Sequence, residues 1–138
     1  MKTMQKWLGV LMLTMVLSGL ASRANAATFN VKQAVMARDY VGGLPKGISI
    51  LFKPTQRKIY GVVIFDRIFT GVARGVWTAV SAKGIAANTQ FLDNSTGKVR
   101  MDRAHFSAKL PNNWPVGRYK LDIYIDGKKI RTLFYSVR

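Results

Sequence analysis

The stretch YKLDIYIDG, residues 119–127, carries the clearest structural signal in the sequence. From Tyr119 to Ile125 every second residue is large and apolar, and this period of two places those residues on one buried face of a strand. Asp126 and Gly127 follow, and both residue types tolerate a positive φ, so they predict a tight hairpin turn. The return strand is expected at Ile130 to Val137. The C-terminal part of the chain is therefore predicted to be a β-hairpin.

Short apolar segments separated by turn residues also occupy the chain before this hairpin. Residues 28–41 fit either a strand or a helix, and we favour a strand because of the apolar alternation and the glycine-rich exit. Further strands are expected at residues 48–52, 59–65, 76–81, 85–92 and 99–110. Asp93 to Gly97 is expected to be a turn, since its side chains can satisfy the neighbouring backbone. Gly71 and Gly75 are likewise interpreted as turn positions.

This spacing of strands predicts an all-β fold. About seven short strands in roughly 110 residues indicate an immunoglobulin-like antiparallel β-sandwich. Trp77 lies in a middle strand, and we expect it to fill the core. A single domain is the natural count for this length, and such a chain can bury a core without disulfides.

The first 26 residues are predicted to be a cleavable signal peptide that forms a signal helix. Lys2 and Lys6 precede the uncharged run Trp7–Leu20, and Ala24-Asn25-Ala26 matches the A-x-A motif of signal peptidase sites. A bilayer span needs about 20 apolar residues, so a retained membrane anchor is the less favoured alternative. The sequence has no cysteine, which excludes a lipid anchor attached through that residue. Cleavage is expected to release residues 27–138 as one β-sandwich domain, either periplasmic or secreted.

Positive charge is the most unusual global property of the chain. The sequence has 22 Lys and Arg residues against 6 acidic residues, and its net charge is +16. Three of the basic residues belong to the predicted signal peptide, so 19 basic and 6 acidic residues remain, a formal charge of +13. Such a field attracts polyanions, and the alternative is that it serves solubility alone. We expect an anionic envelope polymer or an envelope protein as the partner, and we disfavour nucleic acid because of the predicted export.

The predicted C-terminal hairpin is the candidate binding surface. Its basic and aromatic residues can share an exposed face, and they are Lys120, Tyr124, Lys128, Lys129 and Arg131. Trp114 lies in a preceding loop beside Asn112 and Asn113, where it could stack on a sugar ring or anchor a protein contact. The alternative for Trp114 is burial over the end of the core.

Catalytic and metal-binding patterns are not found in the sequence. His105 is the single histidine, and Ser107 two residues away does not make a nucleophile–base pair. The aspartates suggest no paired carboxylates, since Asp93 and Asp126 are expected in turns and Asp122 on an outward strand face beside Lys120. One histidine without cysteines gives no metal-ligand spacing. We therefore expect neither enzymatic activity nor a metal or cofactor.

The segments that carry a family resemblance are Phe52-Lys53-Pro54, Ile59-Tyr60, Trp77, WPVGRY at 114–119, Asp126-Gly127 and Tyr135-Ser136-Val137. Over residues 48–138 the chain resembles small exported bacterial proteins with an immunoglobulin-like sandwich. The resemblance implies the fold and export, and it implies no particular activity. The cysteine pair of antibody domains is absent.

The sequence as a whole predicts a non-enzymatic exported β-sandwich that binds or scaffolds an anionic envelope component. The alternative is a protein–protein component, such as an inhibitor, a chaperone-like factor or a surface-structure subunit, which could accept a partner strand at an edge. The sequence carries no signal for an oligomeric state.

Overall fold

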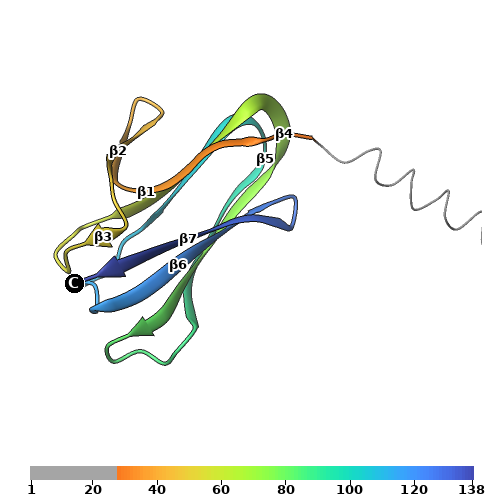
Figure 1. Ribbon diagram of the computed structural model, residues 1–138. Helices are drawn as coiled ribbons and strands as arrows, with labels where there is room; N and C mark the ends of the chain where they lie inside the picture. Colours follow the sequence, from red (N-terminus) through yellow and green to blue (C-terminus); the bar gives the residue numbers. More distant parts are fainter. Residues whose placement is uncertain (1–27) are drawn as a thin grey trace, which may run out of the picture.

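The computed structural model describes residues 28–138, so the predicted signal peptide and its helix lie outside the described residues. The regular structure in this range consists of seven strands (Figure 1). They are β1 (Val31–Val41), β2 (Leu44–Ile48), β3 (Leu51–Phe52), β4 (Ile59–Ala82), β5 (Thr89–Ala108), β6 (Gly117–Ile125) and β7 (Lys128–Val137). Among residues 28–138 there is no helix that could cross a membrane. The predicted all-β class is confirmed.

The seven strands belong to one curled, mixed sheet. Its order is β2-β1-β4-β6-β7-β3, and β5 pairs with β4 off this path. All pairings are antiparallel except the short parallel pairing of β3 with β7. β2 is an edge strand that pairs with β1, and it carries Pro45 and Lys46.

The long β4–β5 hairpin gives the sheet its curl. The first part of β4, from Tyr60 to Phe65, pairs with β1, whereas the part from Ala73 to Ala82 pairs with β6. Its pairing with β5 is irregular between Ile64 and Phe69. Figure 1 shows the hairpin bending over here, so that the β1 limb and the β6–β7 limb of a half-barrel face each other.

The two limbs meet closely at glycines of β4. A side chain at Gly61 would collide with Leu121 of β6, which lies in the facing limb. A Cβ at Gly75 would lie 2.8 Å from the ring of Phe106 in β5. Both glycines therefore permit the approach of large apolar groups across the core.

Aromatic side chains fill the core at the end where β7 finishes. The rings of Tyr119 and Tyr135 stack at 5.3 Å, and Trp114 lies edge-on to Tyr119 at 5.4 Å. Trp77 is fully buried beside them, as the sequence predicts. The hydroxyl of Tyr119 donates to the carbonyl of Pro115 at 2.5 Å, which fixes the loop before β6.

Two local expectations are confirmed. Residues 31–41 form a strand, β1, and not a helix. The C-terminal hairpin forms with Tyr119 opposite Tyr135 and Leu121 opposite Leu133. All four alternating apolar residues of β6 are buried, as their period of two predicts.

Other expectations are wrong because strands continue where the sequence suggests turns. The segments 59–65 and 76–81 are parts of β4, and Gly71 and Gly75 lie inside it. The expected turn at 93–97 lies inside β5, where its side chains serve the neighbouring strand: Trp77 Nε1 donates to Asn94 Oδ1 at 2.9 Å. The segment 48–52 is divided between β2 and β3, and residues 85–88 connect β4 to β5. An immunoglobulin-like sandwich of two separate sheets is not confirmed, because one curled sheet contains all seven strands.

The contact between the limbs can be tested at Gly61. Gly61→Ala is expected to lower the free energy of unfolding by about 1–3 kcal/mol, because its methyl group overlaps Leu121 in a packed core. Urea denaturation followed by tryptophan fluorescence measures this change. The double variant Gly61→Ala/Leu121→Ala should lose less than the sum of the two single variants. Wild-type stability of Gly61→Ala would contradict the close contact.

Candidate functional site

The predicted basic face of the C-terminal hairpin is partly neutralised. Lys120 Nζ lies 3.6 Å from Asp122 Oδ2, and Lys129 Nζ lies 4.0 Å from Asp122 Oδ1. The Asp122 side chain is only 8% exposed, and Thr132 Oγ1 donates to it at 2.5 Å. Asp122 therefore lies on the outer face of the sheet, as expected, but its neighbours Lys120, Lys129 and Thr132 leave it little exposed. The two lysines share this carboxylate.

Tyr124 also has an internal partner. The guanidinium of Arg74 lies 5.5 Å from the centre of the Tyr124 ring. Arg74 is itself held by Asp93, with Nη2 and Oδ2 at 2.7 Å. One face of the Tyr124 ring is therefore occupied within the domain.

Lys128, Lys129 and Arg131 are brought together at the tip of the hairpin. They line a hollow of about 800 Å³ together with residues 28–31. We call this the hairpin hollow. The predicted hairpin residues thus divide between a sheet face, where Lys120 and Tyr124 lie, and a hollow at one end of the domain.

Trp114 is not on the surface, so its expected role in contacting a ligand is wrong. The residue is 2% exposed and packs against Tyr119 and Phe91. Its backbone N donates to the carbonyl of Pro54 at 2.8 Å, which ties this loop to the loop between β3 and β4. Trp114 covers the end of the core, which was the alternative considered for it.

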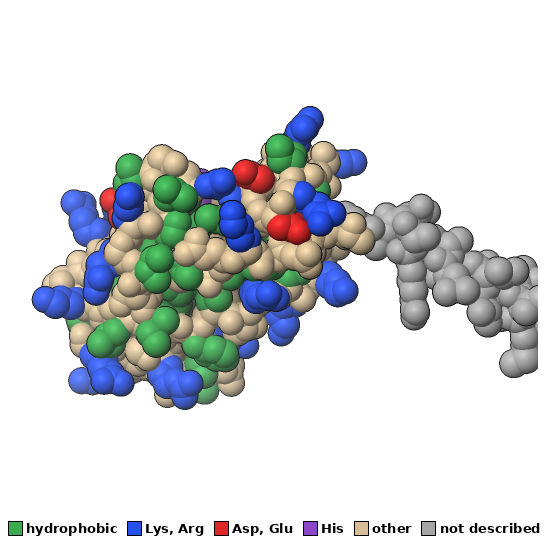
Figure 2. Space-filling model, turned by 45° about the horizontal axis from the view of Figure 1, so that its top comes forward, with side chains coloured by type: hydrophobic (Ala, Val, Ile, Leu, Met, Phe, Trp, Pro, Cys, Tyr) green, Lys and Arg blue, Asp and Glu red, His purple; other side chains and the backbone are tan. Residues whose placement is uncertain are grey.

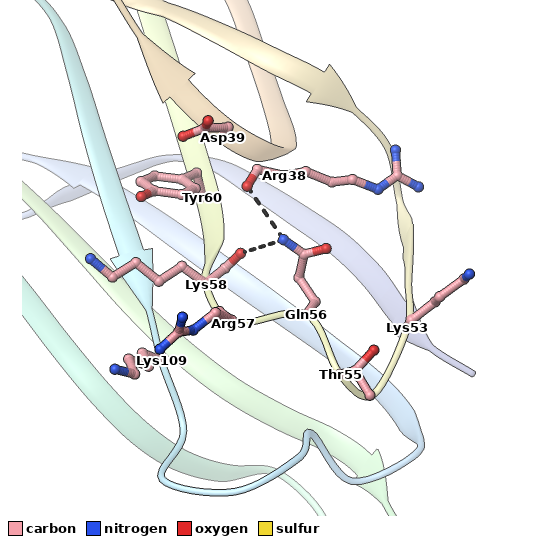
Figure 3. Close-up of a pocket in the computed structure, with 9 residues that line it drawn as sticks. All are labelled: Arg38, Asp39, Lys53, Thr55, Gln56, Arg57, Lys58, Tyr60 and Lys109. Carbon is pink, nitrogen blue, oxygen red and sulfur yellow. Dashed lines mark hydrogen bonds between the residues drawn. The ribbon is translucent and has the colours of Figure 1, made fainter.

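A second and more basic hollow lies at the opposite end of the domain, and no pattern in the sequence predicts it. Its volume is about 660 Å³. Five cations and one acid line it together with Thr55, Gln56 and Tyr60; the charged residues are Arg38, Asp39, Lys53, Arg57, Lys58 and Lys109 (Figure 3). We call this the basic hollow. It combines residues from β1, the β3–β4 loop, β4 and the segment after β5.

The β3–β4 loop is fixed in place by hydrogen bonds. The Nε2 of Gln56 donates to the carbonyl of Lys58 at 3.0 Å and to that of Arg38 at 3.4 Å. The backbone N of Gln56 donates to the carbonyl of Lys53 at 3.0 Å and closes a turn. Figure 3 shows Gln56 between two groups of cations: Lys58, Arg57 and Lys109 on one side, and Arg38 and Lys53 on the other.

The base of this loop depends on the end of the chain. Phe52 is buried, and its carbonyl accepts a hydrogen bond from the N of Arg138 at 3.0 Å. The N of Ser136 donates to the carbonyl of Ile50 at 2.8 Å. The parallel β3–β7 pairing therefore positions the loop that carries Lys53, Arg57 and Lys58.

Most acidic side chains are engaged elsewhere. Three of them bind arginines: Arg67–Asp66 at 3.1 Å, Arg74–Asp93 at 2.7 Å and Arg103–Asp102 at 3.0 Å. In each pair the side-chain hydrogen bonds from the arginine lower the pKa of the carboxyl. Asp39 accepts a hydrogen bond from the N of Tyr40 at 2.8 Å. Among residues 28–138, no ion pair involves the five cations of the basic hollow.

An adjoining hollow of about 650 Å³ extends the basic hollow. It shares Thr55, Gln56, Arg57 and Lys109 with the basic hollow and continues to Asn112 and Asn113. We call this the amide hollow. The two together form an open, elongated depression with cations at one end and amides at the other. Figure 2 shows that Lys and Arg side chains also project around much of one face of the domain.

Groups for acid–base or metal chemistry do not cluster in the described range. His105 stacks on Tyr40, with ring centres 4.1 Å apart. Within residues 28–138 there is no group of three or more His or acidic side chains that could hold a metal ion. What the basic hollow offers chemically is a set of cationic and amide donors around a loop that is held by hydrogen bonds.

Similarity to known proteins is found at the level of structure and not of sequence. No family model matches the sequence, and no curated protein is similar to it. A similar solved structure is the Pseudomonas fluorescens alkylpurine DNA glycosylase AlkC bound to DNA containing an abasic site analog. The TM-score is 0.49 at 10% sequence identity, over 82% of this chain and 31% of the other. This chain therefore spans less than a third of the glycosylase.

Two expectations about the partner are corrected against this neighbour. An anionic envelope component, with a protein–protein role as its alternative, was expected, and nucleic acid was disfavoured. The neighbouring protein was solved in complex with DNA. Nucleic acid was disfavoured because of the predicted export alone, and a signal peptide determines where a protein goes, not which polyanion its charge attracts.

The ion pairing of Asp66 predicts a response to acid. Hydrogen bonds from Arg67 and Asn30 hold the pKa of Asp66 well below its ordinary value of 3.8. A lowered carboxyl pKa stabilises the fold above the ordinary value, and this stabilisation is lost as the pH falls toward the folded-state pKa. We expect the urea midpoint of unfolding to decrease as the pH is lowered from about 5 to about 2, and to decrease less in Asp66→Asn. An equal fall in both proteins would contradict the assignment.

Proposed function

We propose that this protein is a non-enzymatic binding domain for single-stranded nucleic acid, and that its basic hollow holds the phosphate backbone. The observation that carries the proposal is the gathering of five cations around one fixed loop with a single acid, Asp39, among them. Lys and Arg bind phosphate oxygens through charge-assisted hydrogen bonds. Neutralising phosphates releases counterions and provides most of the affinity of such proteins.

The form of the site favours a single strand over a duplex. Duplex readers commonly insert a helix or a β-ribbon into a groove. The basic hollow is instead a depression between β1, a loop and the start of β4, and a flexible strand can follow it. Single-strand binders combine such a cationic groove with aromatic rings on which bases stack.

Tyr60 supplies an aromatic ring at this depression. It is half-buried and lines the basic hollow with Asp39 and Lys58 (Figure 3). In the amide hollow, Asn112 and Asn113 are exposed beside Lys109. We assign to Tyr60 the stacking of a base, and to the two asparagines hydrogen bonds with the sugar or base edges.

A binding role without catalysis is supported by the state of the reactive groups. The carboxylates of Asp66, Asp93 and Asp102 are held by arginines as ionised partners. Asp126 accepts a hydrogen bond from the backbone N of Val72 at 2.8 Å. Carboxylates engaged in this way stabilise local structure, and they do not form the facing acid pair that glycoside hydrolysis needs.

Export and a relation to immunoglobulin-like domains belong to the same proposal. The leader pattern of residues 1–26 supports export to the periplasm or the medium. The hydrogen bond of Tyr119 to Pro115 is similar to the tyrosine corner of immunoglobulin-like sandwiches, and buried Trp77 matches their core tryptophan.

The export proposal has a direct measurement. Intact mass spectrometry of the protein recovered from periplasm or medium should give a chain that begins at Ala27, because Ala24-Asn25-Ala26 precedes the cleavage site. Recovery of the uncleaved chain in the cytoplasm would show that export is wrong.

The nucleic-acid proposal is tested by removing charge from the basic hollow. We expect the purified protein to bind a fluorescein-labelled oligothymidylate of about 16 nucleotides, with a slope of log K on log[salt] of about −3.5 for five cations. Arg57→Gln/Lys58→Gln/Lys109→Gln should weaken binding on the order of tenfold at low salt and reduce the slope by about 2. Fluorescence anisotropy at several KCl concentrations measures both quantities.

A matched control separates the site from the overall charge. Lys46→Gln/Lys83→Gln/Lys98→Gln removes the same charge at exposed positions that line none of the three hollows. It should leave the dissociation constant within about threefold. Gln56→Ala should weaken binding without changing the salt slope, because it loosens the loop and keeps every charge. Equal losses in the two triple variants would defeat the proposal, as would tighter binding of a duplex.

A further inference from the structure

The hairpin hollow is a second basic site at the far end of the domain from the basic hollow. It lies between residues 28–31 and the tip of the β6–β7 hairpin, and Lys128, Lys129 and Arg131 supply its charge. Figure 1 places that tip at one end of β7, whereas β3 and the C-terminus lie at the other end. The two hollows share no residue.

The charge of the hairpin hollow is available to a ligand. Lys128 and Arg131 take part in no ion pair among the described residues, and Lys129 is only loosely held, 4.0 Å from Asp122. Asp126 is the one acid in the lining, and its carboxylate is committed to the backbone N of Val72 at 2.8 Å. The hairpin turn is tight, with Asp126 and Gly127 both at positive φ.

The two hollows are too far apart to act as one charged patch. Residues 132–137 of β7 lie between Arg131 and the end of the domain that carries the basic hollow, and six strand residues span about 20 Å. This distance is more than twice the Debye length of about 8 Å at physiological ionic strength. On the sheet face between them, Lys120 is paired with Asp122 and neighbours the exposed, apolar Phe134. This face therefore attracts a phosphate backbone less than either hollow does.

We infer that the protein holds two segments of nucleic acid at once, one in each hollow, and so bridges strands. This inference rests on the proposed function of the basic hollow. The chemistry of the second site is the same, since Lys128, Lys129 and Arg131 offer ammonium and guanidinium donors to phosphate oxygens. Asn30 and Thr28 add uncharged polar groups to the same wall.

Bridging is tested by asking whether the protein bound to one strand captures a second strand. A biotinylated oligothymidylate of about 16 nucleotides is fixed to beads, the full protein is added, and a free fluorescein-labelled copy of the same strand is supplied. We expect the wild-type protein to retain the free strand on the beads. Lys128→Gln/Lys129→Gln/Arg131→Gln should stay on the beads at nearly the wild-type level while losing most of the captured fluorescence. The Lys46, Lys83 and Lys98 triple variant serves as the control of equal charge and should capture normally.

The outcomes separate this inference from the proposed function. Capture by the hairpin triple variant at the wild-type level overturns the bridging assignment, and it is also the result that self-association through another surface would give. Failure of wild-type protein to capture a second strand while binding the first overturns it as well. If single-strand binding itself is insensitive to the Arg57, Lys58 and Lys109 substitutions, it is the proposed function that fails.

Discussion

The close approach of the two limbs of the sheet is the constraint on which the rest of the structure depends. Gly61 leaves room for Leu121 of the facing limb, and Gly75 leaves room for the ring of Phe106. This contact holds the bent β4–β5 hairpin closed around an apolar core. It also brings the β3–β4 loop and the segment after β5 to the same end of the domain, where Trp114 and Pro54 are joined by a backbone hydrogen bond. The β3–β4 loop on one side of this junction lines the basic hollow.

Local patterns determined what could be predicted from the sequence. The C-terminal hairpin was predictable because period-two alternation and an Asp-Gly turn lie within one short stretch. The length of β4 was not, because glycine is common in turns and only the structure shows what faces these positions: the ring of Phe106 at Gly75 and the carboxylate of Asp126 at Gly71. The basic hollow could not be predicted for a similar reason. Among its five cations only Arg57 and Lys58 are adjacent in sequence, while Arg38 and Lys109 reach the site through the pairings of β1, β4 and β5.

The positions of the acidic residues, more than the number of basic residues, determine where positive charge on the surface is neutralised. Aspartates are few, and most form ion pairs with neighbouring arginines or accept hydrogen bonds from backbone groups. Asp122 neutralises positive charge in the middle of the β6–β7 face, where it forms an ion pair with Lys120. Net charge alone suggested a uniformly positive protein, whereas ion pairing neutralises part of the β6–β7 face and leaves the five cations of the basic hollow without an ion-pair partner among the described residues. This distribution could not be read from composition, since it depends on which carboxylate each cation reaches.

The parallel pairing of β3 with β7 has a consequence for the order in which the molecule folds. Residues 50–52 are anchored by Ser136 and Arg138, which lie 86 positions later in the sequence. Contacts between such distant positions form late in folding, because the intervening chain must be ordered first. The loop that carries Lys53 and Arg57 thus acquires its final shape after the β4–β5 hairpin has paired. Loss of the contacts of residues 136–138 would release that loop while leaving the β4–β5 hairpin paired, so the shape of the basic hollow depends on a strand that contributes no residue to its lining.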